Sequence, residues 1–188
     1  MTIVDVVVEV HEHLEHDEVA HAFGGALALS YYAEPRATVD VDLNIFSPFA
    51  SASAVVSAFE ATGLVAVETE ERWLRVAGVR LSRAADRATV DLFFSLDEHY
   101  DEIASRAVTF PFGPAHRPLP FLSAEDLALF KLSFGRPKDW VDLQALCRAG
   151  RELDVAYIER QLLALRGPAM NPRLARLRAM LRQAGEAR

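Results

Sequence analysis

A strict alternation of polar and apolar side chains runs from residue 36 to residue 46, and no other stretch constrains the fold as tightly. The apolar side chains are Ala37, Val39, Val41, Leu43 and Ile45, and the polar ones are Arg36, Thr38, Asp40, Asp42 and Asn44. A period of two is typical of a β-strand with one buried face. We therefore predict a strand over 36–46 that carries Asp40 and Asp42 on its polar face.

The rest of the first 120 residues predicts a mixture of helices and strands. Apolar residues at helical spacing indicate helices over 5–22, 26–33 and 51–62, the first of which runs into a short strand before a Gly-Gly turn. Alternating patterns indicate further strands over 64–70, 73–83 and 87–95.

The remainder of the chain predicts helices only. The proline-rich stretch 110–120 is typical of a loop or an edge segment. A capping-box pattern begins the next helix at Ser123, and apolar spacing indicates three more at 138–149, 153–166 and 171–184. We expect an α/β (α+β) fold, with a mixed sheet flanked by helices as a core over 1–120 and a C-terminal helical subdomain over 121–188 packed on that core.

Composition excludes several classes of protein. Of the 188 residues 51% are hydrophobic and 25% are charged, which are ordinary values for a folded protein. No apolar run reaches the ~18 residues of a membrane-spanning helix, and the first residues lack the basic start of a secretory signal. We expect a cytoplasmic protein without membrane contact. The single Cys147 excludes an internal disulfide and has the apolar neighbours of a core residue.

The formal charge of −7 is unevenly spread. From Arg160 to the C-terminus there are seven arginines and one acidic residue, Glu186, so this tail carries +6 against −13 for the remainder. Such a tail is typical either of a solvated helix face or of a docking surface for an anion or an acidic partner. Both interpretations stay open from the sequence.

Acidic residues are depleted in strands, so the two aspartates of the alternating stretch need an explanation. Their spacing places the carboxylates on one face, ~7 Å apart along the backbone, where a divalent cation can offset their repulsion. Asp91 lies in an equally apolar stretch and would bring a third carboxylate to that face from a neighbouring strand. Such a set favours Mg²⁺ or Mn²⁺, and two ions ~3.5 to 4 Å apart can activate a hydroxyl and stabilise leaving pyrophosphate.

A strand whose polar face simply meets water is the alternative interpretation of these aspartates. Gly24 and Gly25 weigh against it, because a Gly-Gly turn that opens a helix can hold a phosphate with backbone N–H groups.

Four histidines near the N-terminus do not complete a zinc motif. The zincin pattern that would begin at His11 requires a second histidine at position 15, which is Glu15. We interpret His11, His13, His16 and His21 as solvated helix residues.

The motifs together resemble a known superfamily. Phe23-Gly24-Gly25, the run from Arg36 to Leu43 (RATVDVDL) and the run from Thr89 to Leu92 (TVDL) are similar to the motifs of the DNA polymerase β-like nucleotidyltransferases. The segments SAEDLALFK, which ends at Lys131, and RPKDWVDL resemble the AbiEii branch, of the abortive-infection and type IV toxin–antitoxin systems. The superfamily often has Gly-Ser closer to the aspartates, whereas the AbiEii branch has Gly-Gly at a longer spacing, as here. The resemblance covers roughly residues 20–146.

The resemblance implies roles for the residues around the aspartates. Asp40 and Asp42 would bind the metal ions, and Asp91 would complete the site and help to activate the incoming hydroxyl. Gly24 and Gly25 would approach the triphosphate of the nucleotide.

The resemblance also implies a cationic contribution to nucleotide binding. Arg36 and Thr38 would share the acidic face, and Lys131 would offer its charge to the phosphates. By its sequence context alone, Lys131 also has the pattern of a rim lysine with a buried aliphatic stem. Asp139 and Asp142 share one helix face and are predicted to form structural ion pairs with nearby cations.

The implied activity is that of a Mg²⁺-dependent nucleotidyltransferase, which moves a nucleoside monophosphate from an NTP to a hydroxyl of RNA, tRNA or a protein and releases pyrophosphate. The resemblance further implies a toxin-like role with an antitoxin protein as partner, and the arginine-rich tail would then face RNA or the antitoxin. Two alternatives stay open: a non-catalytic nucleotide-binding or antitoxin-like protein of this fold, and a transferase acting on a small molecule such as an antibiotic. The presence of all three aspartates argues against the first.

Overall fold

Residues 1–76, 78–95 and 98–186 are described by a computed structural model. Their contacts divide the chain into two units. The sheet unit consists of Met1–Leu27 and Ala37–Phe121, and the helical unit consists of Ala28–Arg36 and Leu122–Arg188. Within the helical unit, the hydroxyl of Tyr32 donates a 2.8 Å hydrogen bond to the carbonyl of Leu122, which ties the segment 28–36 to the C-terminal helices.

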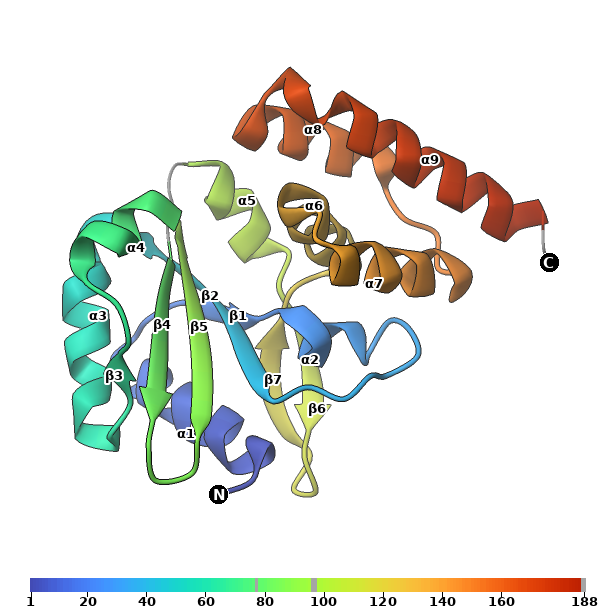
Figure 1. Ribbon diagram of the computed structural model, residues 1–188. Helices are drawn as coiled ribbons and strands as arrows, with labels where there is room; N and C mark the ends of the chain where they lie inside the picture. Colours follow the sequence, from blue (N-terminus) through green and yellow to red (C-terminus); the bar gives the residue numbers. More distant parts are fainter. Residues whose placement is uncertain (77, 96–97, 187–188) are drawn as a thin grey trace. The chain divides into compact units, whose positions relative to one another are not determined.

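The sheet unit is built on a mixed sheet, as the sequence predicts. In the described residues its seven strands have the order β3-β4-β5-β2-β1-β7-β6. β2 pairs with β5, and β1 with β7, in parallel, while the other neighbours are antiparallel (Figure 1). The strands are β1 (His21–Phe23), β2 (Asp40–Pro48), β3 (Val65–Ala66), β4 (Gly78–Arg83), β5 (Ala88–Ser95), β6 (Val108–Phe112) and β7 (Arg117–Phe121).

Helices accompany the strands and make up the second unit. The sheet unit contains α1 (Ile3–His16), η1 (Phe49–Ser51), α3 (Ala52–Ala58), η2 (Phe59–Thr62), α4 (Glu70–Val76) and α5 (His99–Ser105), and α2 (Gly25–Leu29) crosses from one unit into the other. The helical unit contains α6 (Ala124–Phe134), α7 (Pro137–Arg148), α8 (Val155–Arg166), η3 (Pro168–Met170) and α9 (Asn171–Glu186).

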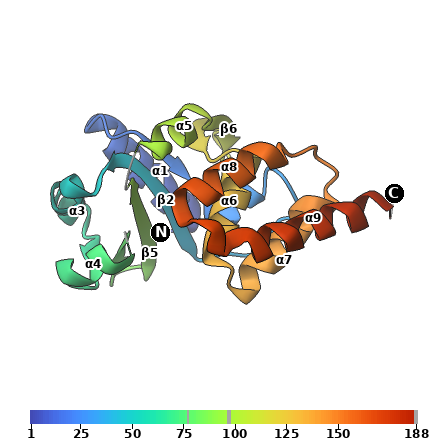
Figure 2. The same ribbon diagram turned by 90° about the horizontal axis from the view of Figure 1, so that it is seen from above.

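Within the helical unit, α6 packs against α7 and α8, and α9 packs against α7. The last two helices, in red tones, lie over the brown α6 and α7 in Figure 1 and in the view from above in Figure 2. None of the helices in the described ranges is long and apolar enough to cross a membrane.

Burial alternates along β5 and over residues 40–43 of β2, as the sequence pattern predicts, but Asn44, expected on the polar face, is buried. Val41 and Leu43 are buried, whereas Asp40 and Asp42 are only half-buried. The predicted start of the strand at residue 36 is wrong: β2 begins at Asp40, where its pairing with β5 starts opposite Thr89.

Other element boundaries also differ from the prediction. Residues 73–83 are not one strand: α4 comes first, with two glutamates in its first turn where the helix dipole favours negative charge, and β4 follows. The strand predicted over 64–70 shrinks to β3, and α5 was not predicted. The proline-rich stretch forms much of the β6–β7 hairpin, in which β6 is an edge strand that tolerates proline.

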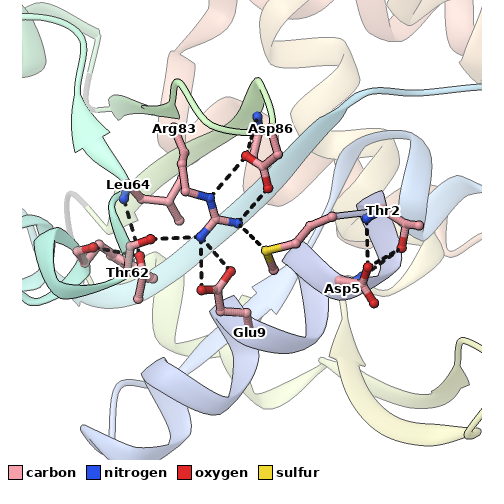
Figure 3. Close-up of polar contacts among 10 residues, drawn as sticks. Thr2, Asp5, Glu9, Thr62, Leu64, Arg83 and Asp86 are labelled. Carbon is pink, nitrogen blue, oxygen red and sulfur yellow. Dashed lines mark hydrogen bonds and ion pairs between the residues drawn. The ribbon is translucent and has the colours of Figure 1, made fainter.

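Arg83, at the end of β4, fixes α1 against the β4–β5 turn (Figure 3). Only 8% of this residue is exposed. Its guanidinium donates hydrogen bonds to the carboxylates of Glu9 and Asp86 and to the carbonyl of Thr62. Such complete pairing makes a buried charge tolerable, and it holds the start of β5, the strand that carries Asp91.

Candidate active site

Three aspartates lie on one face of the central strands of the sheet unit. Asp40 and Asp42 are two residues apart on β2, so their side chains point to the same face. The parallel pairing of β2 with β5 places Asp42 directly opposite Asp91 and Asp40 opposite Thr89. The juxtaposition that the sequence predicts is thus present, while the roles of these residues as metal ligands stay predictions.

The Gly-Gly pair lies against the same aspartates. The backbone N–H of Gly24 donates a 2.9 Å hydrogen bond to the carbonyl of Asp42. Gly25 has a φ of +56°, and a Cβ atom added there would lie 1.8 Å from Oδ2 of Asp42. A side chain at this position would be strained by the left-handed backbone conformation and would displace the Asp42 carboxylate, so the position favours glycine.

Arg80, which the sequence analysis missed, occupies this face as well. It lies opposite Asp91 in the β4–β5 hairpin, and its Nε and Nη2 atoms donate to Oδ1 and Oδ2 of Asp91 at 2.7 and 2.6 Å. These hydrogen bonds, and then the charges of Asp91, Asp40 and Asp42, raise the pKa of Arg80 above its ordinary value. The alternation around Gly78 and the hairpin register are the signals that could have revealed it.

The donor set fits a hard divalent cation, since carboxylate oxygens are the preferred ligands of Mg²⁺ and Mn²⁺. Within the described residues no three Asp, Glu, His or Cys side chains form a ready-made metal site. At Asp91 both oxygens are hydrogen-bonded to Arg80, so a cation already balances this carboxylate. A divalent ion bound by Asp91 would have to replace that guanidinium at one oxygen at least.

Arg36 and Lys131 meet at a buried aspartate of the helical unit. Nε of Arg36 lies 2.8 Å from Oδ1 of Asp142, and Nζ of Lys131 lies 2.6 Å from Oδ2. Lys131 is buried rather than at a rim, and Asp142 is 1% exposed. Burial alone would raise the pKa of Asp142, but the hydrogen bonds from Arg36 and Lys131 lower it below its usual value.

The expected acidic strand face that includes Arg36 and Thr38 does not form, since both residues precede β2. The hydroxyl of Thr38 accepts a hydrogen bond from the N–H of Asp40 and donates one to its carbonyl. The structure therefore brings the three aspartates and the glycine pair together in the sheet unit, and Arg36 and Lys131 together in the helical unit.

Arginines of the C-terminal tail have partners inside the helical unit. Arg173 donates to the carbonyls of Leu132 and Ser133 at the end of α6. Arg176 stacks over Trp140, and Arg178 pairs with Glu159. Part of the positive charge of the tail therefore stabilises the helical unit itself. The predicted pairing of Asp139 is also present, with Arg136 as its partner.

Two of the N-terminal histidines are not solvated, contrary to the expectation. His11 on α1 and His21 on β1 are each 9% exposed, and Nδ1 of His11 lies 3.0 Å from Nε2 of His21. The Nδ1–H of His21 donates to the carbonyl of Val19 at 2.7 Å. Burial lowers the pKa of both imidazoles. Cys147 is buried, as predicted.

The fold is similar to that of solved nucleotidyltransferases. The crystal structure of the antibiotic-resistance factor ANT(2'')-Ia in complex with adenylyl-2''-tobramycin has 15% identity and a TM-score of 0.52 and covers 96% of this chain and 97% of that chain. Lincomycin-bound LnuA, a lincosamide antibiotic adenylyltransferase, has 14% identity and a TM-score of 0.52 over 77% and 96%. An antigenic nucleotidyltransferase-like protein from Paracoccidioides brasiliensis has 15% identity and a TM-score of 0.53 over 92% and 91%.

At these identities the structural likeness concerns the fold. A search of curated proteins gives no significant match. The family described as "Nucleotidyl transferase AbiEii toxin, Type IV TA system" matches residues 12–185, a range that contains every candidate residue named above. The chain therefore belongs to the AbiEii family of nucleotidyltransferases.

Proposed function

We propose that the protein transfers a nucleoside monophosphate from an NTP to a hydroxyl group, with Mg²⁺ held by Asp40, Asp42 and Asp91. The observation that carries this proposal is the register of β2 and β5, which sets Asp42 opposite Asp91 on the face where Gly25 leaves room for nothing larger than hydrogen. Mn²⁺ has the same preference for oxygen ligands and would substitute for Mg²⁺. Nucleotidyl transfer is the chemistry of the family.

Each residue has a defined part in the proposed reaction. Bound Mg²⁺ would supply Lewis acidity at the phosphates and lower the pKa of the attacking hydroxyl. Asp40 and Asp42 supply ligand oxygens, and Asp91 also accepts the proton of the acceptor hydroxyl. The acceptor oxygen forms a bond to the α-phosphorus while the bond from that phosphorus to the α,β-bridging oxygen breaks, and pyrophosphate leaves with that oxygen.

Nucleotide binding would draw on the remaining matched residues. Gly24 and Gly25 allow the triphosphate to approach the backbone next to Asp42, and Thr38 shapes the entry to β2. The resemblance predicts that Arg36 and Lys131 offer positive charge to the phosphates, and both bind Asp142 within the helical unit.

For the acceptor, we propose RNA, including tRNA, or a protein hydroxyl, in the role of a toxin with an antitoxin protein as its partner in the cytoplasm. The family description as a type IV toxin supports this role. Binding of an RNA acceptor would weaken steeply with salt, because phosphate contacts release counterions.

A small-molecule acceptor is the second candidate, and one observation favours it. The sheet unit has 18 acidic residues and seven arginines, which gives it a formal charge of −11. A unit of this charge attracts a cationic acceptor and repels a polyanion. The fold is also shared with the antibiotic-resistance factor ANT(2'')-Ia and with LnuA, a lincosamide antibiotic adenylyltransferase.

Label transfer separates these candidates. The protein is incubated with Mg²⁺ and each [α-³²P]NTP in the presence of total tRNA, a protein extract or a panel of aminoglycosides and lincosamides, and the products are resolved by size. We expect label in one acceptor class with the wild type and none with Asp42→Asn. A non-catalytic nucleotide-binding protein would bind NTP with both variants and label nothing, and that result would contradict the proposal.

A further inference from the structure

The Arg80–Asp91 ion pair has a feature that a purely structural cross-strand pair does not require. Two parallel hydrogen bonds engage both carboxylate oxygens of Asp91, at 2.7 and 2.6 Å. The pair is placed on the aspartate face, and Asp40 and Asp42 contribute to the electrostatic field at the guanidinium. Arg80 is thus a cation that already resides among the three carboxylates proposed to bind Mg²⁺.

The exposure of the two partners differs. The side chain of Arg80 is 49% exposed, whereas that of Asp91 is 18% exposed. An arginine on the open side of such a pair can swing away on its long stem without unpacking the core, while the aspartate stays fixed by its strand. The carboxylate is therefore the stationary partner, and the guanidinium is the one that can exchange.

A divalent ion at Asp91 competes with the bidentate hydrogen bonds from Arg80, because the ion needs at least one of the two oxygens that Arg80 engages. A guanidinium displaced from Asp91 keeps its charge and can bind another anion, and two oxygens of a phosphate match its paired N–H donors. The nucleotide proposed to bind with the metal would supply such oxygens beside Asp91.

Resting on the proposed function, we infer that Arg80 exchanges its partner: it occupies Asp91 in the free protein, leaves when the metal–nucleotide complex enters, and then binds the triphosphate. Arg80 is accordingly a nucleotide-binding residue that also lowers the affinity of the free protein for divalent cations. Loss of Arg80 should therefore raise the affinity for divalent cations and lower the affinity for nucleotide. Loss of a purely structural ion pair would not change the two affinities in opposite directions.

The test measures Mn²⁺ and nucleotide binding separately on the full chain. Mn²⁺ binding to the free protein is followed by the electron paramagnetic resonance signal of unbound Mn²⁺. Nucleotide binding is followed by calorimetry at saturating Mn²⁺ with the four α,β-methylene NTP analogues, which cannot be turned over. For Arg80→Gln we expect Mn²⁺ to bind about three- to tenfold more tightly than to the wild type, and the preferred analogue to bind about three- to tenfold more weakly.

Arg72→Gln is the matched control. It removes the same charge and breaks another ion pair, in which Arg72 of α4 lies 2.8 Å from Glu68, two residues before that helix. We expect both affinities to stay at the wild-type value. Arg80→Lys, which keeps the charge but not the paired hydrogen bonds, should fall between the wild type and Arg80→Gln for both ligands, and thermal unfolding of every variant checks that it is folded.

The outcomes separate this inference from the proposed function. If the wild type binds Mn²⁺, Asp42→Asn does not, and Arg80→Gln binds Mn²⁺ with the wild-type affinity, the proposed partner exchange is wrong and the proposed metal site stands. If both affinities of Arg80→Gln fall together, Arg80 supports the site structurally and the exchange is again wrong. If neither the wild type nor Arg80→Gln binds Mn²⁺, with or without the nucleotide analogue, the proposed function and the inference fail together.

Discussion

Gly25 shows how a single residue shapes the candidate site. Its positive φ and the 1.8 Å approach of an added Cβ to Oδ2 of Asp42 leave no room for alanine. We expect Gly25→Ala to displace the Asp42 carboxylate, to destabilise the fold by about 1 kcal/mol or more, and to abolish label transfer.

Gly185→Ala provides the comparison for this prediction. Gly185 is a helical glycine with open space around its Cα, so the same substitution should be neutral or slightly stabilising. Urea unfolding and the label-transfer assay measure both variants. An active Gly25→Ala protein would show that Asp42 does not need its present position.

The buried pair of His11 and His21 makes stability depend on pH. Burial lowers the pKa of both imidazoles below the ordinary value of 6.5. The unfolded chain therefore binds more protons than the folded chain as the pH falls below 6.5. The contribution of the two neutral histidines to the free energy of unfolding is complete above that pH and is lost as the pH decreases toward their folded-state pKa values.

Urea unfolding between pH 5 and pH 8 tests this prediction. We expect the free energy of unfolding to fall below about pH 6.5 with a slope of up to about 1.4 kcal/mol per pH unit for each histidine. His21→Gln should flatten the slope, and His16→Gln, at an exposed position of α1, should leave it unchanged. An equal slope in His21→Gln would contradict the assignment.

At the scale of elements, Asp142 of α7 joins Lys131 of α6 and Arg36 of the segment 28–36. Asp142→Asn would leave the buried ammonium of Lys131 without its counter-charge. Breaking a buried pair by removing one partner destabilises a protein by about 3–5 kcal/mol. We expect a loss of this size in urea unfolding.

Glu159→Gln is the control for the Asp142 variant. It breaks the half-exposed pair with Arg178, for which the expected loss is about 1 kcal/mol or less. The lowered pKa of Asp142 also predicts a pH dependence. The ion pair stabilises the fold above pH 3.8, the unfolded pKa of this carboxyl, and this stabilisation disappears as the pH falls below that value. Equal effects of the two substitutions would contradict the buried ion pair.

Patterns local to one element were predicted well from the sequence. The alternation of β2 and β5 predicts the shared face of Asp40, Asp42 and Asp91, since both strands have one apolar face. The capping residue Ser123 and Gly135 bound α6 as expected. The short apolar run in α4 does not distinguish a helix from a strand, and it was assigned wrongly.

Contacts between elements were harder to predict. The ion pair of Arg80 with Asp91 depends on the hairpin register, and the burial of His11 depends on the packing of α1 against β1. Arg36 was expected on the strand face because the alternation of polar and apolar residues continues to it. A strand also requires a neighbouring strand to pair with, and the pairing of β2 with β5 begins only at Asp40. The membership of 28–36 in the helical unit has no local signal at all.

In the molecule as a whole, the two units carry net charges of opposite sign. The helical unit has 13 basic and nine acidic residues and a formal charge of +4, against −11 for the sheet unit. Several of its arginines bind carbonyls of α6, stack on Trp140 or pair with Glu159. Fewer positive charges of the tail are therefore available to an external anion than the sequence count suggests.

The position of the transferred label shows whether the three strand-borne aspartates direct nucleotidyl transfer. Wild-type protein and Asp40→Asn are given Mg²⁺, a responsive acceptor and the same NTP labelled at either the α- or the γ-phosphate. We expect the wild type to transfer the α-label and to release the γ-label in pyrophosphate, and we expect Asp40→Asn to do neither. Transfer of the γ-label to the acceptor, or full activity of Asp40→Asn, would contradict this role of the aspartates.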